Sequence, residues 1–132
     1  KEAFAAVLLD APCSGLGTLV SRPDLRWRRS PNDVERLAGL QRRLLRRATA
    51  LVRPGGALTY SVCTITRAET IAVLDDLLRD GGWRLDDLGA EYPRFAHPGC
   101  GGALLTLPSS HGTSGFFVAR VRRETRRPRG NS

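Results

Sequence analysis

The chain has 132 residues, which is enough for one domain with a modest core. It has no run of about 20 apolar residues that could cross a membrane and no signal-peptide pattern at its start, so we expect a cytoplasmic protein. The net charge of +8 suits a polyanionic partner, but all but one of the 21 basic residues are Arg, and GC-rich coding explains this bias equally well.

The three cysteines, Cys13, Cys63 and Cys100, are widely spaced and contain no CxxC pair. This spacing argues against a disulfide framework or a zinc site and favours free thiols in a reducing compartment. His97 and Cys100 in "HPGC" have the spacing of half a metal site, but without a second half a loop is the better interpretation, and we expect no metal. The chain lacks methionine and begins at Lys1, which indicates a piece of a longer protein.

The first expected element is a strand over residues 4–10, where an apolar run ends in Asp10, as in a strand buried on both faces of a parallel sheet. Residues 11–29 form a long loop with a basic cluster. Ser30, Pro31 and Asp33 then predict a capped helix start. The helix places apolar or buried positions at helical spacing, namely Val34, Leu37, Gln41, Leu44, Ala48 and Leu51, and places Arg42, Arg43, Arg46 and Arg47 mostly on other faces.

"RPGG" at residues 53–56 ends this helix, and residues 57–63 read as a second strand, parallel to the first by a right-handed crossover. Thr66 and Glu69 predict a capping box that opens a second helix, which "DGG" at residues 80–82 ends. The apolar face of this helix consists of Ile71, Val73, Leu74, Leu77 and Leu78.

Three further strands are expected at residues 83–88, 104–107 and 116–122, with a Pro- and Gly-rich loop over 91–102. The pattern predicts an α/β fold that contains the second half of a sheet, with parallel strands, helix crossovers and a final antiparallel strand. Residues 1–122 form the domain, and residues 123–132 form a disordered basic tail.

Cys13 and Cys63 both lie at carboxyl ends of expected strands, where open α/β sheets bind their ligands. A single cysteine at such a place is more often part of the core than a catalyst, but two that converge on one crevice favour chemistry. Disulfide exchange normally uses CxxC, and a cysteine hydrolase needs a histidine base, for which only His97 and His111 are available.

The segments "DAPCSG", "RPDLRWRRSP", "LVRPGG", "YSVCTI" and "HGTSGFFVAR" closely resemble the Sun (Nol-Nop-Sun) family of RNA cytosine-5 methyltransferases, which includes a bacterial small-subunit ribosomal RNA methyltransferase. The resemblance covers nearly all of the chain except residues 89–102 and the tail. It implies a Rossmann-like methyltransferase sheet, S-adenosylmethionine as cofactor and RNA as partner, with rRNA favoured over tRNA. Val62 and Thr70 depart from the usual residues of the family, which puts fine geometry in doubt but leaves both thiols.

The family's chemistry answers a physical need, because carbon 5 of cytosine is too weak a nucleophile to take a methyl group directly. A thiolate that adds at carbon 6 turns the ring into an enamine that can do so. The resemblance implies that Cys63 is this nucleophile and that Cys13 helps to release the product. Asp10 would contact the cytosine edge and lie beside the methionine portion of the cofactor.

The resemblance also implies substrate and cofactor contacts around these residues. Pro12 is assigned to the cofactor region, where its carbonyl could accept from the cytosine amino group, although a plain turn role is equally open. The RNA-binding candidates are Ser14, Arg26, Trp27, Arg28 and His111. Arginines and an indole suit phosphate contact and base stacking, whereas the simpler role of Trp27 is to anchor its loop on the core.

The family's main cofactor-binding motifs precede "DAPCSG" and are not in this sequence, so we expect the chain to lack the N-terminal half of its catalytic domain and to be inactive in isolation. It would bind the cofactor weakly and leave the outer edge of its first strand unpaired. Two alternatives stay open, a noncatalytic basic RNA-binding module or remnant and a DNA cytosine-5 methyltransferase. Cys63 at the end of the second strand favours the RNA family over the DNA enzymes.

Overall fold

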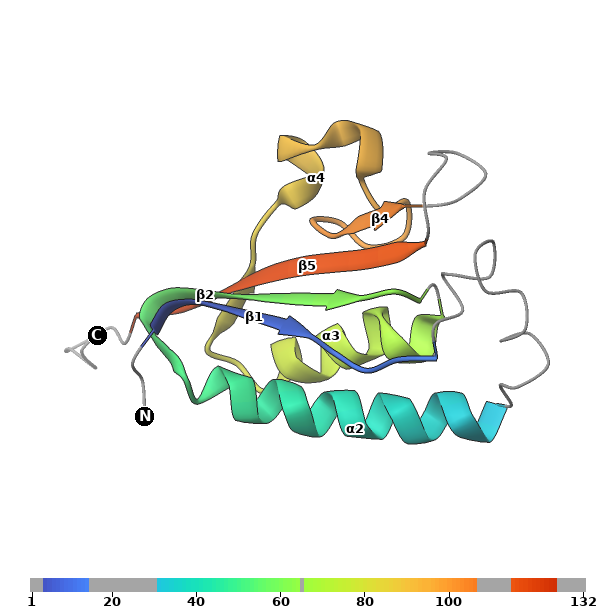
Figure 1. The fold of residues 1–132 in the computed structure, drawn as a ribbon. Helices are drawn as coiled ribbons and strands as arrows, with labels where there is room; N and C mark the ends of the chain where they lie inside the picture. Colours follow the sequence, from blue (N-terminus) through green and yellow to red (C-terminus); the bar gives the residue numbers. More distant parts are fainter. Residues whose placement is uncertain (1–3, 15–30, 65, 107–114, 126–132) are drawn as a thin grey trace.

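The computed structural model describes residues 4–14, 31–64, 66–106 and 115–125. Strands and helices alternate through the first half of the chain, and the second half holds α3, several short elements and the long strand β5 (Figure 1). The elements are β1 (Phe4–Asp10), α2 (Pro31–Thr49), β2 (Val52–Val62), η2 (Arg67–Glu69), α3 (Ile71–Arg79), β3 (Trp83–Leu85), α4 (Leu88–Glu91), η3 (Pro93–Phe95), β4 (Leu104–Thr106) and β5 (Phe116–Arg123).

The strands form one mixed sheet in the order β1-β2-β5-β3, with β4 also paired to β5. β1 and β2 are parallel, as the helical crossover predicts, and β5 is antiparallel to β2, β3 and β4. The predicted α/β sheet with a final antiparallel strand is confirmed. The insertion of β5 between β2 and β3 is a feature that the linear pattern does not indicate.

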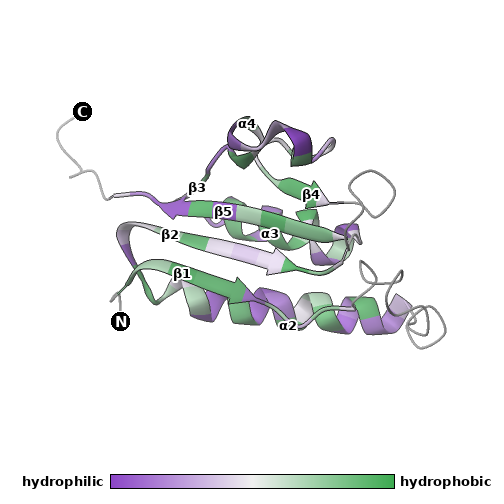
Figure 2. Cartoon of the chain, turned by 45° about the horizontal axis from the view of Figure 1, so that its top comes forward, coloured by the Kyte–Doolittle hydropathy of each residue, from purple (hydrophilic) through white to green (hydrophobic). Residues whose placement is uncertain are grey.

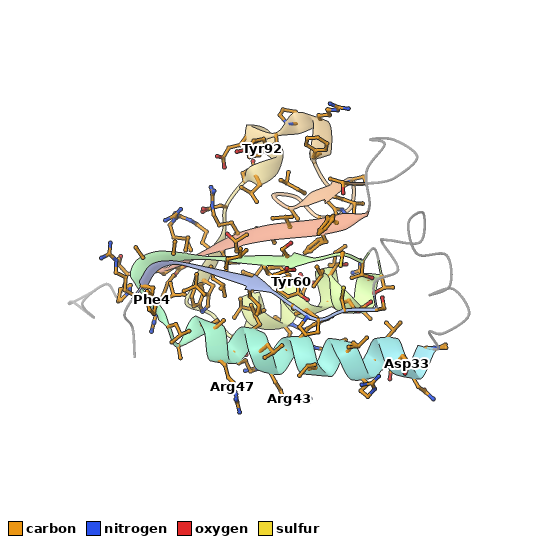
Figure 3. The ribbon with its side chains drawn as sticks, in the orientation of Figure 1. Phe4, Asp33, Arg43, Arg47, Tyr60 and Tyr92 are labelled. Carbon is orange, nitrogen blue, oxygen red and sulfur yellow. The ribbon has the colours of Figure 1, made fainter. Side chains whose placement is uncertain are left out.

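The core lies between the sheet and helices α2 and α3, which occupy the same side of it (Figure 1). Alternate residues of β2 and β5 point into this layer and are almost completely buried, namely Leu58, Tyr60, Val62, Phe117, Ala119 and Val121. Figure 3 shows Tyr60 in this layer, whereas Arg43 and Arg47 point from α2 away from the sheet. The predicted polar face of α2 is confirmed for these two arginines.

The apolar face of α2 is rotated slightly from the predicted one. Leu37, Gln41 and Ala48 are buried as expected, but Leu45 and Ala38 fill the core where Leu44 and Leu51 were predicted. Leu51 lies beyond the helix and is 40% exposed.

β1 is correct in its bounds but wrong in its predicted burial. It is a largely apolar strand at the edge of the described sheet (Figure 2). Its apolar side chains are not covered on both faces, because Phe4 is 53% and Leu8 is 69% exposed. β2 begins at Val52 and therefore contains "RPGG", which was predicted to lie before the strand. A register shift between Phe4 and Ala6 accommodates this start.

The remaining differences are local. β3 ends at Leu85, and the predicted loop over residues 91–102 contains the end of α4 and the 3₁₀ turn η3. β5 extends to Arg123, one residue into the predicted tail, and Glu124 donates its backbone N–H to Gly82. No helix in the described ranges is long and apolar enough to cross a membrane.

Candidate functional site

The two thiols singled out by the sequence meet at the carboxyl end of the β1–β2 pair. Cys13 lies three residues beyond the end of β1 and Cys63 directly follows β2. Their Sγ atoms are 3.5 Å apart, both side chains are half-buried, and no disulfide joins them. The parallel register of β1 and β2, which places Asp10 opposite Ser61, brings these two strand ends together. The predicted convergence of the thiols is therefore present in the structure.

A buried carboxylate lies behind the thiols. Glu69 is fully buried and accepts hydrogen bonds from the backbone N–H of Ser14 at 2.6 Å and from the hydroxyl of Ser14 at 2.7 Å. The hydroxyls of Thr64 and Thr66 donate to its Oε2 at 2.9 and 2.5 Å. These contacts fasten the segment after β1 to the segment after β2.

The predicted capping box of Thr66 and Glu69 is wrong, because the Glu69 carboxylate is used in this buried cluster. The carboxylate points inward and meets the Thr66 side chain instead of the Thr66 backbone N–H, and residues 67–69 form a 3₁₀ turn ahead of α3. Sequence reasoning missed this cluster of hydroxyls around Glu69. Its only sequence signal was the presence of two hydroxyl residues just after the second strand, at positions 64 and 66.

The Glu69 carboxyl is ionised more easily than an ordinary glutamate. Burial by itself would raise its pKa, but the hydrogen bonds from Thr66, Ser14 and Thr64 favour the charged form and lower the pKa below the usual value. The buried Tyr60 hydroxyl donates to the backbone carbonyl of Glu69 at 2.8 Å, and burial together with the Glu69 charge raises the pKa of this phenol. The surroundings therefore favour the ionised form of a carboxyl that is bonded to the residues directly following the two cysteines.

Gln41 of α2 connects the turn after β1 to the same carboxylate. Its Nε2 donates to the carbonyl of Pro12 at 2.9 Å and to Glu69 Oε1 at 3.2 Å, and its side chain is fully buried. The Pro12 carbonyl, predicted to face the substrate, thus has a partner within the fold, although an oxygen with two lone pairs can accept a second hydrogen bond. Asp10 is exposed at the end of β1.

Ser14 differs from the sequence prediction. It was expected to contact RNA, but it is fully buried, and its backbone N–H and hydroxyl both face Glu69. In the structure Ser14 therefore makes contacts within the protein, with Glu69. The other RNA-binding candidates, Arg26, Trp27, Arg28 and His111, lie outside the described residues.

The "HPGC" segment, predicted to be a loop, packs against β5. His97 accepts a hydrogen bond at Nδ1 from the Gly99 backbone N–H, and its ring packs edge-on against Phe117 with centroids 5.7 Å apart. Burial lowers the pKa of His97 and raises that of Cys100. These contacts fit the loop interpretation of "HPGC", and within the described ranges no cluster of three or more His, Cys, Asp or Glu side chains could hold a metal.

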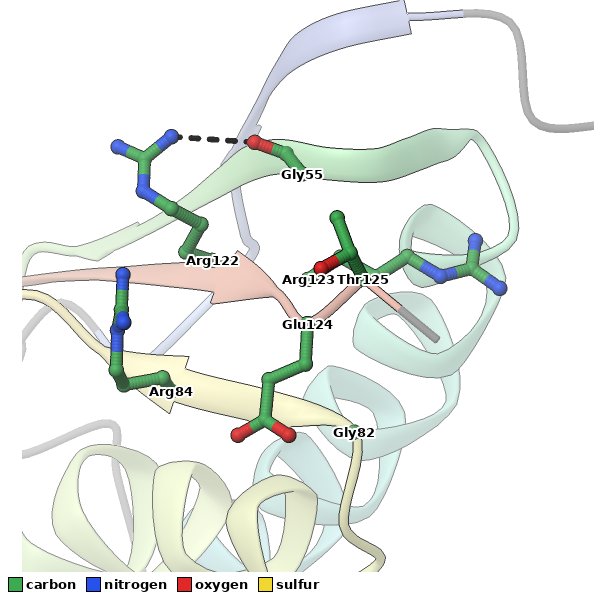
Figure 4. Close-up of a pocket in the computed structure, with 7 residues that line it drawn as sticks. All are labelled: Gly55, Gly82, Arg84, Arg122, Arg123, Glu124 and Thr125. Carbon is green, nitrogen blue, oxygen red and sulfur yellow. Dashed lines mark hydrogen bonds between the residues drawn. The ribbon is translucent and has the colours of Figure 1, made fainter. Parts of the chain in front are cut away.

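A cavity of about 710 Å³ lies at the opposite end of the sheet from the thiols, where β2 begins and β5 ends (Figure 4). Its charged lining consists of Arg84, Arg122, Arg123 and Glu124. Arg122 donates to the Gly55 carbonyl at 3.3 Å and pairs with Asp86 at 2.9 Å, while Arg123 donates to the Val52 carbonyl. Most of this positive charge is thus used to join strands.

The mixed sheet, with β5 antiparallel beside the parallel β1–β2 pair, has the Rossmann-like fold of the methyltransferases that are its solved structural neighbours. Residues 1–122 match the family model described as "16S rRNA methyltransferase RsmB/F", and the chain belongs to this family.

Known proteins agree with this assignment. The chain is 48% identical over 123 residues to a putative methyltransferase, Rv1407, of Mycobacterium tuberculosis. The aligned region covers 92% of this chain and 27% of that protein. It is 42% identical to a probable ribosomal RNA small subunit methyltransferase B of Synechocystis, covering 92% and 28%. The structure of NSun6 from Pyrococcus horikoshii with SFG superposes with a TM-score of 0.77 at 32% identity, covering 90% and 30%. The chain thus spans less than a third of each of these proteins.

Proposed function

We propose that this chain is the catalytic half of an enzyme that methylates carbon 5 of a cytosine in RNA, with ribosomal RNA as the substrate and the cytoplasm as its compartment. The observation that carries the proposal is the 3.5 Å separation of the Cys13 and Cys63 sulfurs at the carboxyl ends of two parallel strands. Family membership and the relatives named for small-subunit rRNA support the substrate class.

Two thiols can divide the reaction into steps that neither performs alone. Cys63 adds to carbon 6 of the cytosine as a thiolate and makes carbon 5 nucleophilic enough to take a methyl group. Once a base removes the proton from carbon 5, the carbon–sulfur bond breaks and Cys63 leaves. Cys13 would assist this elimination as a proton donor or acceptor, and its distance of 3.5 Å from Cys63 supports this role.

S-adenosylmethionine would supply the methyl group in this reaction, as the SFG, an analogue of this cofactor, in the NSun6 structure suggests. The described residues fit part of such a group. Asp10 offers an exposed carboxylate at the strand end, which suits the positive charges of the methionine portion, and the exposed Pro12 stands beside it. The remaining contacts would come from the part of the family domain that this chain does not contain.

The roles of the thiols are tested by trapping the covalent RNA adduct in the full-length gene product. Cys63→Ala should abolish the adduct and the methylation, because the nucleophile is gone. Cys13→Ala should let the adduct accumulate, because elimination is slowed while addition is retained. Denaturing gel electrophoresis of labelled RNA measures both. Adduct accumulation in Cys63→Ala and its loss in Cys13→Ala would reverse the assignment, and the absence of both adduct and methyl transfer in the wild type would favour a noncatalytic RNA-binding module.

A further inference from the structure

Glu69 is a buried carboxylate whose hydrogen-bond partners among the described residues are all neutral groups. Its side chain is fully buried, and within the described part of the chain its partners are the hydroxyls of Ser14, Thr64 and Thr66, the Ser14 backbone N–H and the Gln41 amide. Burial of an ionised carboxylate away from a counter-charge is costly even when hydrogen bonds offset part of the cost. An apolar residue at this position would leave these buried donors without an acceptor, so the carboxylate is what holds them together.

The partners of Glu69 are the sequence neighbours of the thiols. Ser14 directly follows Cys13 and Thr64 directly follows Cys63, and both donate to the same carboxylate oxygen, Oε2. Their own hydroxyl oxygens are 3.1 Å apart, close to the 3.5 Å between the sulfurs one residue earlier. The carboxylate therefore clamps the two segments at the residues next to the reacting groups.

Gln41 of helix α2 contributes to the same set of hydrogen bonds. Gln41 uses its two amide hydrogens to hold the Pro12 carbonyl on one side and Glu69 Oε1 on the other. Pro12 immediately precedes Cys13, so the backbone is fixed on both sides of this thiol, by Gln41 before it and by Glu69 after it.

We propose that Glu69 is a positioning residue that sets the separation and orientation of the Cys13 and Cys63 thiols. It acts through Ser14 and Thr64, whose hydroxyls donate to its carboxylate. The inference deepens the proposed function, on which it rests for the catalytic meaning of the two thiols, but the geometry that it asserts is a property of the protein without substrate.

The separation of the thiols is measured by their equilibrium with glutathione in the full-length gene product. As the Cys13–Cys63 disulfide forms, the two thiols give up two electrons and two protons, and oxidised glutathione is reduced to two thiols. The equilibrium constant of this exchange gives the effective concentration of one thiol at the position of the other. Peptide mass spectrometry distinguishes the Cys13–Cys63 disulfide from any disulfide that involves Cys100. Glu69→Gln, which places an amide among the donors, should lower the effective concentration about tenfold or more, since small displacements of reacting groups have large effects.

Tyr60→Phe is the matched control for a loss of stability alone. Tyr60 holds the backbone carbonyl of Glu69 and not its carboxylate, so this variant should lower the melting temperature while leaving the effective concentration within about twofold of the wild type. A second pair avoids changing Glu69. Thr64→Val removes one donor to the carboxylate and should lower the effective concentration. Thr64→Ser keeps the hydroxyl and should leave the effective concentration near that of the wild type.

Turnover provides the second readout. In the same gene product, Glu69→Gln should lower kcat with KM for RNA nearly unchanged, because the thiols and not the RNA surface are displaced. A folded Glu69→Gln protein with a wild-type disulfide equilibrium would overturn the positioning role, as would equal losses in Tyr60→Phe. If the wild type transfers no methyl group, the proposed function fails while the glutathione measurement still decides the geometry.

Discussion

Two buried or half-buried carboxylates link the stability of this protein to pH at the scale of single residues. Burial opposes ionisation of Glu69, but hydrogen bonds from hydroxyls and a backbone N–H lower its pKa. Burial also opposes ionisation of Asp86, whose pKa is lowered by hydrogen bonds and charge from Arg122 and Arg120. A group whose pKa is lower in the folded state binds its proton more weakly there than in the unfolded chain.

Acid should therefore unfold the protein through these two groups. Their contribution to stability is fully present above the ordinary carboxyl pKa, about 4.3 for Glu and 3.9 for Asp, and is lost as the pH falls through the lowered values of the folded state. Urea titrations between neutral and acidic pH should show a free energy of unfolding that declines over this window. Glu69→Gln and Asp86→Asn should each flatten the decline, and an unchanged slope in both variants would contradict this account.

The sequence predicted the thiol pair and missed the carboxylate for reasons that are visible in the residues. Cys13 and Cys63 are placed by strand ends, which hydrophobic runs reveal. The role of Glu69 depends on where its side chain points after the segment following β2 has folded against Ser14, which lies 55 residues away. The spacing of Thr66 and Glu69 alone favoured a local cap, but the carboxylate instead accepts from the side chains of Thr66 and of the distant Ser14.

At the scale of elements, the start of β2 depends on close backbone approach at Gly56. A Cβ at this position would lie 2.8 Å from Val52 Cγ1 and 2.9 Å from the carbonyl oxygens of Ala5 and Arg53. A residue without a side chain is therefore needed where β2 passes close to β1, which is consistent with "RPGG" lying inside the strand. Gly39 in α2 is the opposite case, since its nearest neighbour would be Arg43 Nη1 at 3.7 Å.

Gly56→Ala should lower the free energy of unfolding by about 1–3 kcal/mol, because the added methyl group forces the β1 and β2 backbones apart. Gly39→Ala is the matched substitution in the same chain and should raise it by up to about 1 kcal/mol, as alanine is the better helix former. Chemical denaturation followed by circular dichroism measures both changes. Equal effects of the same sign at the two positions would show that the approach of β1 to Gly56 does not limit the packing.

Element bounds were predicted best where tertiary contacts agree with local pattern. The bounds of β1 and the start of α2 match expectation, because apolar runs and a proline at the first turn are local signals. Burial of β1 was not predictable from its composition, since an apolar run looks the same in a central strand and in one whose outer neighbour is absent from the described sheet. The place of β5 between β2 and β3 depends likewise on long-range pairing.

For the whole molecule, the sheet separates its two chemically distinct ends. The thiols, Asp10 and Pro12 lie at the carboxyl ends of β1 and β2, whereas the arginine-lined cavity lies at their amino ends. Arg122 and Arg123 there bond to carbonyls of β2, and Arg122 also bonds to Asp86, so these two side chains fasten β5 to its neighbours. The residues proposed to act in the reaction thus lie together at the carboxyl ends of β1 and β2.

The isolated chain should bind S-adenosylmethionine with a Kd above about 1 mM, a value that corresponds to a binding free energy of about −4 kcal/mol. Asp10 and Pro12 are both exposed, and one solvent-screened carboxylate beside a turn does not bury a ligand of this size. Isothermal titration calorimetry on the chain, with a thermal melt to show that it is folded, measures the affinity. The full-length gene product is the control and should bind the cofactor tightly. Tight binding by residues 1–132 alone would mean that this end of the sheet forms a complete cofactor site, and that the catalytic unit is smaller than its relatives imply.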